Sequence, residues 1–266
     1  MSGIYDEPDL YRLACAYRKI PAEADALLAW CARHGRPTAG RAGFRAESVL
    51  ELAAGPAGHA RELARRGLRA AALDWSAAMC AYAAEQARAD GVALTVHAAD
   101  MRDFTLGTRF DLAITMLNSV CHLFTLDDLV PHLRAVAAHL APGGLYIMEL
   151  AHPADYLSPE SRTSSEWTIE AGGVVADVRW GGGSDRIDPV TQITREHMSI
   201  SARAADGTVR TVADVVPNRF WTATELTAAI RLAGGFSVTA AYGDFDDSTM
   251  LGDPGAWRMI LVLRRD

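Results

Sequence analysis

Residues 48–60 read SVLELAAGPAGHA, residues 69–74 read RAAALD, and residues 94–100 read LTVHAAD. The first stretch is an apolar strand that enters a turn with Gly55 and Gly58 before a helix. Asp74 ends the second strand, and Asp100 follows the third. A glycine turn followed by acids at successive strand ends is typical of sheets that bind a nucleoside at their carboxyl edge. We therefore expect a parallel sheet with a nucleoside site.

Composition excludes several classes of protein. The chain has 266 residues, of which 50% are hydrophobic and 22% charged, as in an ordinary globular domain. With a net charge of −7 and no Lys/Arg cluster, neither nucleic acid nor a membrane surface is an expected partner. The acidic N-terminus has no apolar segment of a signal peptide, and no apolar run approaches the roughly 20 residues of a membrane span. We expect a cytoplasmic enzyme.

The four cysteines, Cys15, Cys31, Cys80 and Cys121, are widely spaced and form no CxxC pair. This pattern favours reduced thiols over disulfides or a zinc site, and we expect no metal.

Apolar periodicity predicts strands and helices that alternate through the first half of the chain. The expected order after a helical region at 9–34, interrupted at Pro21, is strand 49–52, helix 60–66, strand 69–73, helix 77–90, strand 94–98, strand 112–116, helix 126–140 and strand 145–150. Alternation with nearly continuous apolar strands indicates a parallel sheet covered on both faces. Residues 165–216 instead carry alternating runs with GGGS, DP and ADG turns, typical of antiparallel strands.

The chain ends with a helix at 221–232, capped by Thr222 or Thr224, and an antiparallel hairpin of strands 237–242 and 257–264. The fold class is therefore α/β, a Rossmann-like doubly wound sheet with a C-terminal antiparallel hairpin and a β-rich insertion after the fifth strand. We expect a helical cap at 1–46, an α/β cofactor-binding core at 47–155, a substrate-binding insertion at 156–218 and the rest of the core at 219–266.

The glycine turn reads A-A-G-P-A-G and lacks the G-x-G-x-x-G pattern of dinucleotide sites. Pro56 also removes one backbone donor that a pyrophosphate would use. Asp74 stands 19 residues after Gly55, where a carboxylate binds ribose hydroxyls, although it could instead cap the next helix.

Four motifs, ELAAGPAGHA, LDWS, AADMRDF and FDLAITMLNSVCHL, resemble those of class I S-adenosylmethionine (SAM)-dependent methyltransferases. The N-terminal DLYRLACAYRKIPAEADAL and the NSVCHL segment are similar to the small-molecule branch, in particular antibiotic amino-sugar N,N-dimethyltransferases and glycine N-methyltransferase. One departure is Gly55-Pro56-Ala57, where the family often has G-x-G. The resemblance implies SAM as cofactor and S-adenosylhomocysteine as product.

By position, the resemblance implies contacts to each part of SAM. Tyr17, Arg18, Glu51 and the Ala53–Gly55 backbone would contact the amino-acid end, and Leu117 and Asn118 the methionine portion. Asp74 would bind the ribose, with Trp75 and Met79 beside the adenosine. Asp100 and Met101 would bind the adenine. Other roles stay open for some of them. Met79, Leu117 and Tyr17 could be core residues, Arg18 could be solvated, and Asp100 could cap a turn.

His122 is the candidate general base, because it follows the fourth strand at the carboxyl edge, where the methyl group is expected. The resembled sugar N-methyltransferases also have a histidine there, and the alternative is a helix-start residue. The insertion should set substrate choice, and the candidate substrate-binding residues are His152, Trp167, Trp180, Arg195, His197 and Trp221. Aromatic side chains in alternating strands also pack against one another, so a packing role stays open for them.

We expect a methyltransferase for a small molecule of secondary metabolism, with nitrogen favoured as acceptor atom over oxygen or activated carbon. One alternative is a SAM-binding enzyme that catalyses a non-methylating step such as cyclisation, and another is an NAD(P)-dependent oxidoreductase. A homodimer is left open, as are the acceptor and the number of methyl groups transferred.

Overall fold

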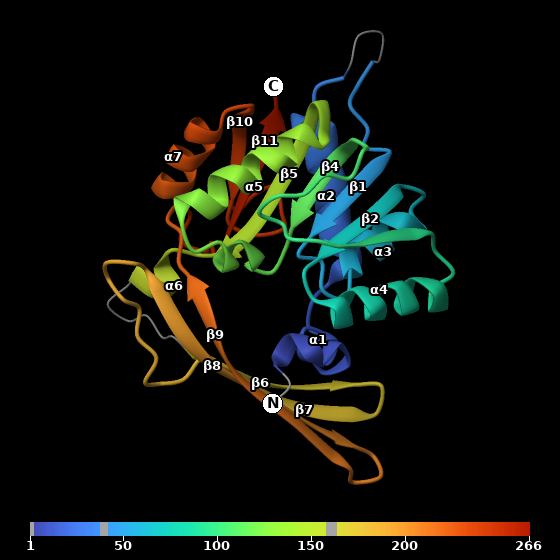
Figure 1. Cartoon of the computed structure of the whole chain (residues 1–266), viewed down its shortest axis with the longest axis vertical. Coiled ribbons are helices and arrows are strands. Elements are labelled where there is room, and N and C mark those ends of the chain that lie inside the picture. Colours follow the sequence, from blue (N-terminus) through green and yellow to red (C-terminus); the bar gives the residue numbers. More distant parts are fainter. Residues whose placement is uncertain (1–2, 38–41, 158–163) are drawn as a thin grey trace.

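The computed structural model describes residues 3–37, 42–157 and 164–266. They form a seven-stranded sheet with helices on both faces and a separate four-stranded antiparallel sheet (Figure 1). The predicted fold class is confirmed. No helix within these ranges combines the length and the apolar character needed to cross a bilayer.

The main sheet has the order β10-β11-β5-β4-β1-β2-β3. Its strands are β1 (Ser48–Leu52), β2 (Arg69–Asp74), β3 (Leu94–Ala98), β4 (Phe110–Thr115), β5 (Leu140–Ala151), β10 (Phe236–Tyr242) and β11 (Arg258–Arg265). The first five are parallel, whereas β11 runs antiparallel to both β5 and β10. The strand order reverses between β1 and β4, which is where open α/β sheets bind ligands.

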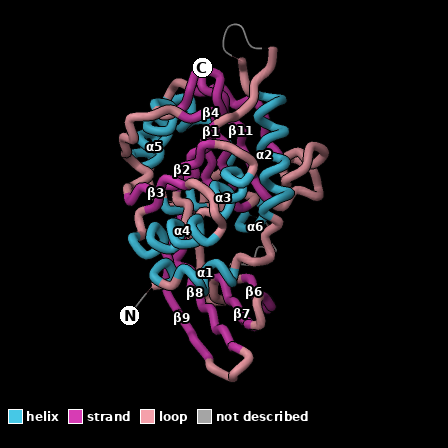
Figure 2. The backbone as a smooth tube through the Cα atoms, turned by 90° about the vertical axis from the view of Figure 1, so that its right-hand side faces the viewer, coloured by secondary structure: helices cyan, strands magenta, loops and turns pink. Residues whose placement is uncertain are grey.

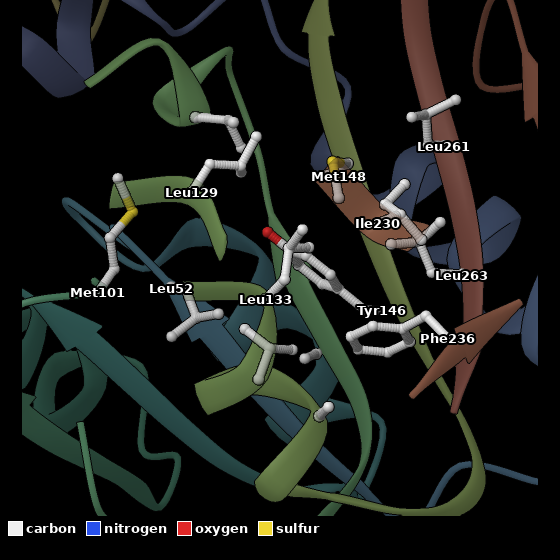
Figure 3. Packing of buried hydrophobic residues seen from close by; sticks show 14 of the residues in the cluster. Leu52, Met101, Leu129, Leu133, Tyr146, Met148, Ile230, Phe236, Leu261 and Leu263 are labelled. Atoms are coloured by element: carbon white, nitrogen blue, oxygen red, sulfur yellow. The ribbon is translucent and has the colours of Figure 1, made fainter. Parts of the chain in front are cut away.

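Two apolar cores cover the two faces of this sheet. On one face pack α2 (Ile20–His34), α3 (Gly58–Arg65) and α4 (Ala77–Ala89), and on the other α5 (Leu126–Ala138) and α7 (Ala223–Ala233). Figure 3 shows the second core, where Tyr146 of β5 lies beside Leu133 and Phe236. The Tyr146 hydroxyl bonds with Thr115 (2.8 Å) and His132 (2.8 Å), so this buried phenol is satisfied.

A third core joins the N-terminus to the insertion. It contains residues of η1 (Ile4–Asp6) and α1 (Pro8–Ala14) packed on β6 (Ser165–Ala171), β7 (Val174–Trp180), β8 (Ile193–Ala204) and β9 (Val209–Arg219). We call η1, α1 and these four strands the cap. Figures 1 and 2 both show α1 between the main sheet and the second sheet. Two short elements, η2 (Ser119–His122) and α6 (Ala154–Leu157), complete the structure.

Several predicted element boundaries need correction. The first helical region is two helices separated by residues 15–19, and Pro21 lies in the first turn of α2, where no backbone donor is needed. The fifth strand begins at Leu140 rather than Leu145. Thr222, not Thr224, caps the last helix, since its side chain accepts from Glu225 N (3.2 Å). Residues 1–2 and 38–41 of the helical cap expected at 1–46, and residues 158–163 of the insertion expected at 156–218, lie outside the described residues.

Candidate functional site

A cavity of about 830 Å³ opens at the carboxyl edge of the main sheet. Its wall includes Ala53, Asp74, Asp100 and Leu117, which end or follow β1, β2, β3 and β4. A second cavity of about 330 Å³ shares Ala53, Gly55 and Leu117 with the first. The two cavities therefore adjoin at the turns after β1 and β4, the point predicted for a nucleoside.

Both of these turns hold unusual backbone conformations. Ala53, Gly55 and Ala57 have φ of 46°, 49° and 53°, and Leu117 and Asn118 have φ of 53° and 61°. A Cβ on Gly55 would meet no atom closer than 3.8 Å, so glycine is needed there for its dihedral angle rather than for space. Non-glycine residues in the left-handed region are strained, and such strain concentrates at ligand sites.

Asp74 holds the glycine turn in place. Its carboxylate accepts from Gly55 N (2.7 Å) and from Ser76 N (2.8 Å). Burial raises the pKa of the Asp74 carboxyl, although these hydrogen bonds oppose the shift. Because a carboxylate has about four acceptor positions, it can also bind ribose hydroxyls. The cap of α4 is Ser76, whose Oγ accepts from Met79 N (3.2 Å), so Asp74 is not the helix cap.

Asp100 and Trp75 form the nucleoside end of the larger cavity. Burial acts to raise the pKa of Asp100, but hydrogen bonds from Arg102 (2.5 Å at the shortest) outweigh it and lower the pKa. Trp75 is 71% exposed, with the Arg102 guanidinium 5.5 Å from its ring. The backbone oxygen of Met101 accepts from His132 Nδ1 (2.7 Å), which fixes this loop. An ionised acceptor and an open ring face suit an adenine.

Arg18 lies in a buried ion network beside the smaller cavity. It donates two hydrogen bonds to Glu149 (2.7 and 2.9 Å) and two to Glu23 (3.1 and 2.7 Å). Arg258 also pairs with Glu149. The alternative of a solvated Arg18 is wrong, because only 8% of the residue is exposed. A guanidinium has five donors, so one stays available for a ligand carboxylate.

His59 completes the network. Its Nε2 donates to Glu23 (2.7 Å) and its Nδ1 to Glu51 (3.3 Å). Burial alone would lower the pKa of His59, but these hydrogen bonds to carboxylates raise it. Glu51 also accepts from Ala60 N (2.7 Å) at the start of α3. Arg18 and Glu51 both line the smaller cavity, which thus offers a cation and an anion to a zwitterionic amino acid.

The opposite end of the larger cavity carries His122. Its Nε2 lies 3.0 Å from the hydroxyl of Tyr5, and the two rings meet edge to face. Burial lowers the pKa of His122, against a hydrogen bond to the Pro217 backbone, so the imidazole is neutral at neutral pH. Burial raises the pKa of Tyr5 well above its ordinary value, so the hydroxyl keeps its proton. A base and a hydroxyl donor therefore stand together in the cavity wall.

A hydrogen-bonded chain lies behind this wall. Cys121 Sγ donates to Asn218 Oδ1 (3.1 Å), and Asn218 Nδ2 donates to Glu196 Oε2 (2.7 Å). The hydroxyl of Tyr156 lies 3.4 Å from the other Glu196 oxygen. Burial raises the pKa of Glu196 to about 7, although both hydrogen bonds oppose the rise. Asn218 and Cys121 line the larger cavity, so the chain fixes which way the Asn218 amide faces.

Several residues that line the larger cavity were not predicted from the sequence. They are Tyr5 and Tyr11 of the N-terminal segment and Asp214 and Asn218 of β9. Asp214 and Asn218 lie two positions before and after buried Val216. Since every second residue of a strand shares a face, this spacing could have placed them on the inner face. No comparable signal exists for Tyr5, which meets a partner 117 positions away.

Of the tryptophans predicted to bind substrate, the structure places only Trp180 in the wall of the larger cavity. Trp167 packs inside the cap and donates Nε1 to Ala14 O (3.1 Å). Trp221 is 1% exposed in the main core, where its Nε1 donates to Leu123 O (3.0 Å). The packing alternative is thus the correct description of Trp167 and Trp221.

Arg195 and His197 do not reach either cavity. Their β8 neighbours Met198 and Ile200 are buried, so residues of odd number point to the outer face of the second sheet. His197 bonds there with Asp185 (2.6 Å), and 62% of its side chain is exposed. The prediction that they point into the substrate site therefore needs correction.

Two further candidates lie beside the cavities rather than in their walls. His152 Nε2 bonds with Leu251 O (3.1 Å) after β5. Tyr17 is 45% exposed, and its ring meets Trp167 edge to face. No group of three His, Cys, Asp or Glu side chains within the described ranges is arranged to hold a metal ion.

Residues 49–144 match a family model described as a methyltransferase domain. Over 132 residues the chain is 36% identical to the dTDP-3-amino-3,6-dideoxy-alpha-D-glucopyranose N,N-dimethyltransferase of Streptomyces fradiae, a match of 48% of each protein. The match thus spans about half the length of this relative. The cypemycin N-terminal methyltransferase of a Streptomyces species is 28% identical over 244 residues, 90% of this chain and 89% of that protein.

Solved structures show the same fold over nearly the whole chain. DesVI of Streptomyces venezuelae superposes with a TM-score of 0.76 at 23% identity and covers 95% of this chain and 96% of its own. The sugar N-methyltransferase KedS8 of a Streptoalloteichus species has a TM-score of 0.71 at 25% identity, with coverage of 100% and 94%.

Proposed function

We propose that the chain is a SAM-dependent methyltransferase of a small-molecule amine in secondary metabolism. Residues 49–144 match a methyltransferase domain, and the main sheet has the class I fold that the sequence resemblance predicted. The observation that supports this proposal most directly is that one cavity is lined both by Gly55, Asp74 and Asp100 and by Tyr5 and His122. The relatives named above methylate nitrogen according to their names, which supports an amine over oxygen or carbon.

The cofactor would lie across both cavities. When bound, SAM supplies an electrophilic methyl group on a sulfonium. Asp74 and Asp100 accept from the ribose hydroxyls and the adenine amino group, while Arg18 and Glu51 meet the carboxylate and the ammonium. These residues fix the position of the methyl carbon relative to the acceptor. Such alignment supplies up to about 7–11 kcal/mol of barrier reduction in model systems.

His122 would manage the proton of the acceptor amine. One nitrogen of the neutral imidazole donates to the Pro217 carbonyl, and Nε2 accepts from the Tyr5 hydroxyl, so the proton would pass through Tyr5. The phenol gives its proton to Nε2 and takes one from the amine, after which the nitrogen lone pair is free to attack the methyl carbon. Tyr5 orients the ring through the 3.0 Å contact with Nε2. The cap covers this end of the cavity and excludes water, which otherwise competes for the same hydrogen bonds.

Isothermal titration calorimetry with S-adenosylhomocysteine tests the proposal. We expect wild-type protein to bind and Asp74→Ala to lose at least about tenfold in affinity, since two ribose hydrogen bonds and the fixed glycine turn are lost. Asp127→Ala, an exposed acid in the first turn of α5, is the matched control. Absence of wild-type binding, or equal affinity in Asp74→Ala, rejects the proposal.

Two rivals are separated by simple readouts. An oxidoreductase would change the fluorescence of NADH on titration, and a non-methylating SAM enzyme would give a product without the mass of an added methylene. The antiparallel β10–β11 pair and the missing third glycine count against the oxidoreductase. Cytoplasmic location and the oligomeric state remain predictions, testable by fractionation and by light scattering.

A further inference from the structure

The two ends of the larger cavity differ in charge. Asp100 and Arg102 pair with each other at the nucleoside end. At the end with Tyr5 and His122, the remaining charged groups in the wall are Asp6 and Asp214. Among the described residues that line this end, neither Lys nor Arg occurs. The acceptor end of the cavity is therefore negative.

Backbone hydrogen bonds hold the Asp214 carboxylate in the wall of the larger cavity. Its Oδ2 accepts from Ile4 N (3.0 Å) and its Oδ1 from Val215 N (2.8 Å). A Cβ on Gly3 would lie 2.8 Å from Oδ2, so a larger residue there would push the carboxylate from its present position. Asp6 Oδ2 accepts from Gly3 N (2.9 Å) on the same segment.

Aromatic rings form much of the remaining wall at this end. Tyr5 and Tyr11 have ring centroids 5.7 Å apart, and Tyr11 and Trp180 have centroids 6.2 Å apart. The faces of such rings attract cations, and a carboxylate beside them adds to that attraction. The rings and the two acids thus favour the same kind of ligand, a cation.

Two arginines of β9 in the cap are engaged with other groups. Arg210 pairs with Glu7 and Asp9, and Arg219 bonds with Glu225 (3.2 Å) while its guanidinium lies over Trp221. A diphosphate is bound in proteins by arginine forks, lysines or helix N-termini, because its charge must be neutralised. Among the described residues that line the cavity, Arg102 is the one Arg or Lys, and it pairs with Asp100. The helix N-terminus in the wall is that of α4, beside Asp74 of the nucleoside site.

We infer that the acceptor is a protonated amine on a molecule without phosphate, and that acceptors joined to a nucleoside diphosphate are rejected. The inference rests on the proposed function and narrows its substrate. The ammonium binds between Asp214 and the aromatic rings, and one N–H proton passes through Tyr5 to His122. The nitrogen lone pair then forms the N–C bond while the C–S bond breaks and its electron pair returns to sulfur. A peptide N-terminus and an unphosphorylated amino sugar share this chemistry.

A matched set of acceptors tests the inference with SAM-loaded, full-length protein. The probes are the methyl glycoside of 3-amino-3,6-dideoxyglucose, the dTDP conjugate of the same sugar, and the dipeptide amide Ala-Ala-NH₂, whose one ionisable group is its N-terminal amine. Formation of S-adenosylhomocysteine gives kcat/KM, and tryptophan fluorescence gives binding. We expect the glycoside or the dipeptide to exceed the conjugate by at least about tenfold in kcat/KM. Which of the two is better identifies the source of the amine.

A preference for the conjugate overturns the inference, and so does failure of both phosphate-free amines to bind or react. Neither result touches the proposed function, because binding of S-adenosylhomocysteine is measured separately. Asp214→Asn should raise KM for the phosphate-free acceptor about tenfold and leave KM for SAM unchanged. The control is Asp206→Asn, the same change in the exposed β8–β9 turn. Equal KM values in the two variants also reject the inference.

Discussion

His122 is the single residue on which the proposed proton transfer depends. We expect His122→Ala to lower kcat by about 100-fold, the lower limit for a positioned general base, with binding of S-adenosylhomocysteine retained. Because burial lowers the pKa of His122, the acid limb of the kcat/KM profile should fall below about pH 6.5 in wild type and disappear in the variant. His197→Ala, outside both cavities, is the control. Unchanged turnover in His122→Ala would place the base elsewhere.

Individual residues differ in how far the sequence could predict their surroundings. Asp74 and Asp100 were predictable because acids at the ends of parallel strands share one edge of a sheet. Tyr5 was not, because its place beside His122 depends on how the whole cap folds onto the main sheet. Arg18 was expected near the cofactor carboxylate. Its partner Glu23 is five positions away, but its other partner, Glu149 of β5, is 131 positions away, which no local pattern reveals.

The segment between α1 and α2 is joined to the main sheet through the guanidinium of Arg18. We expect Arg18→Met to lower the free energy of unfolding by about 3–5 kcal/mol, because Glu23 and Glu149 lose a buried partner. Urea unfolding measures this change. Arg33→Met, which removes an ion pair with Asp247 whose side chains are each 47% exposed, should cost less than about 1 kcal/mol. Equal losses in the two variants would contradict a stabilising role of the network.

At the level of elements, alternation of strand and helix predicted the parallel main sheet, since crossovers between parallel strands usually contain a helix. The faces of β8 were mistaken because Arg195 and His197 were selected for their chemistry. The alternation of side chains along the strand decides which face a residue occupies. Met198 and Ile200 are apolar and buried, so the odd-numbered residues of β8 face outward. The break between α1 and α2 was predicted at Pro21 but lies at residues 15–19, because Pro21 suits the start of a helix as well as its end.

The whole molecule consists of two packed bodies, and the site needs both. The main sheet supplies Asp74, Asp100 and His122, whereas the cap supplies Tyr5 and Asp214. Cofactor binding and acceptor binding therefore involve different cores, and the reacting pair of His122 and Tyr5 forms only where the cap meets the sheet. This arrangement lets the cap determine which acceptor is bound without changing the cofactor site.

Two buried groups give the stability of the whole molecule opposite responses to pH. Burial lowers the pKa of His132 from 6.5 to about 4, so the unfolded chain takes up a proton first, and stability is lost as pH falls from about 6.5 to about 4. Burial raises the pKa of Glu196 from 4.5 to about 7, so the folded chain keeps a proton longer, and stability is lost as pH rises from about 4.5 to about 7.

Each contribution is at most about 3 kcal/mol, and the two largely cancel between about pH 4.5 and 6.5. The pKa of Glu23 is held at about 2, so the stability that its ionised carboxylate contributes is lost only at pH values below this range. We therefore expect these two groups together to add little slope to the wild-type stability curve measured by urea unfolding across that range. Glu196→Gln should lose stability as pH falls, and His132→Gln should lose it as pH rises. Equal slopes of stability against pH in the two variants would show that these groups do not titrate as their burial requires. A packing cost of either substitution shifts its whole curve and leaves the slope unchanged.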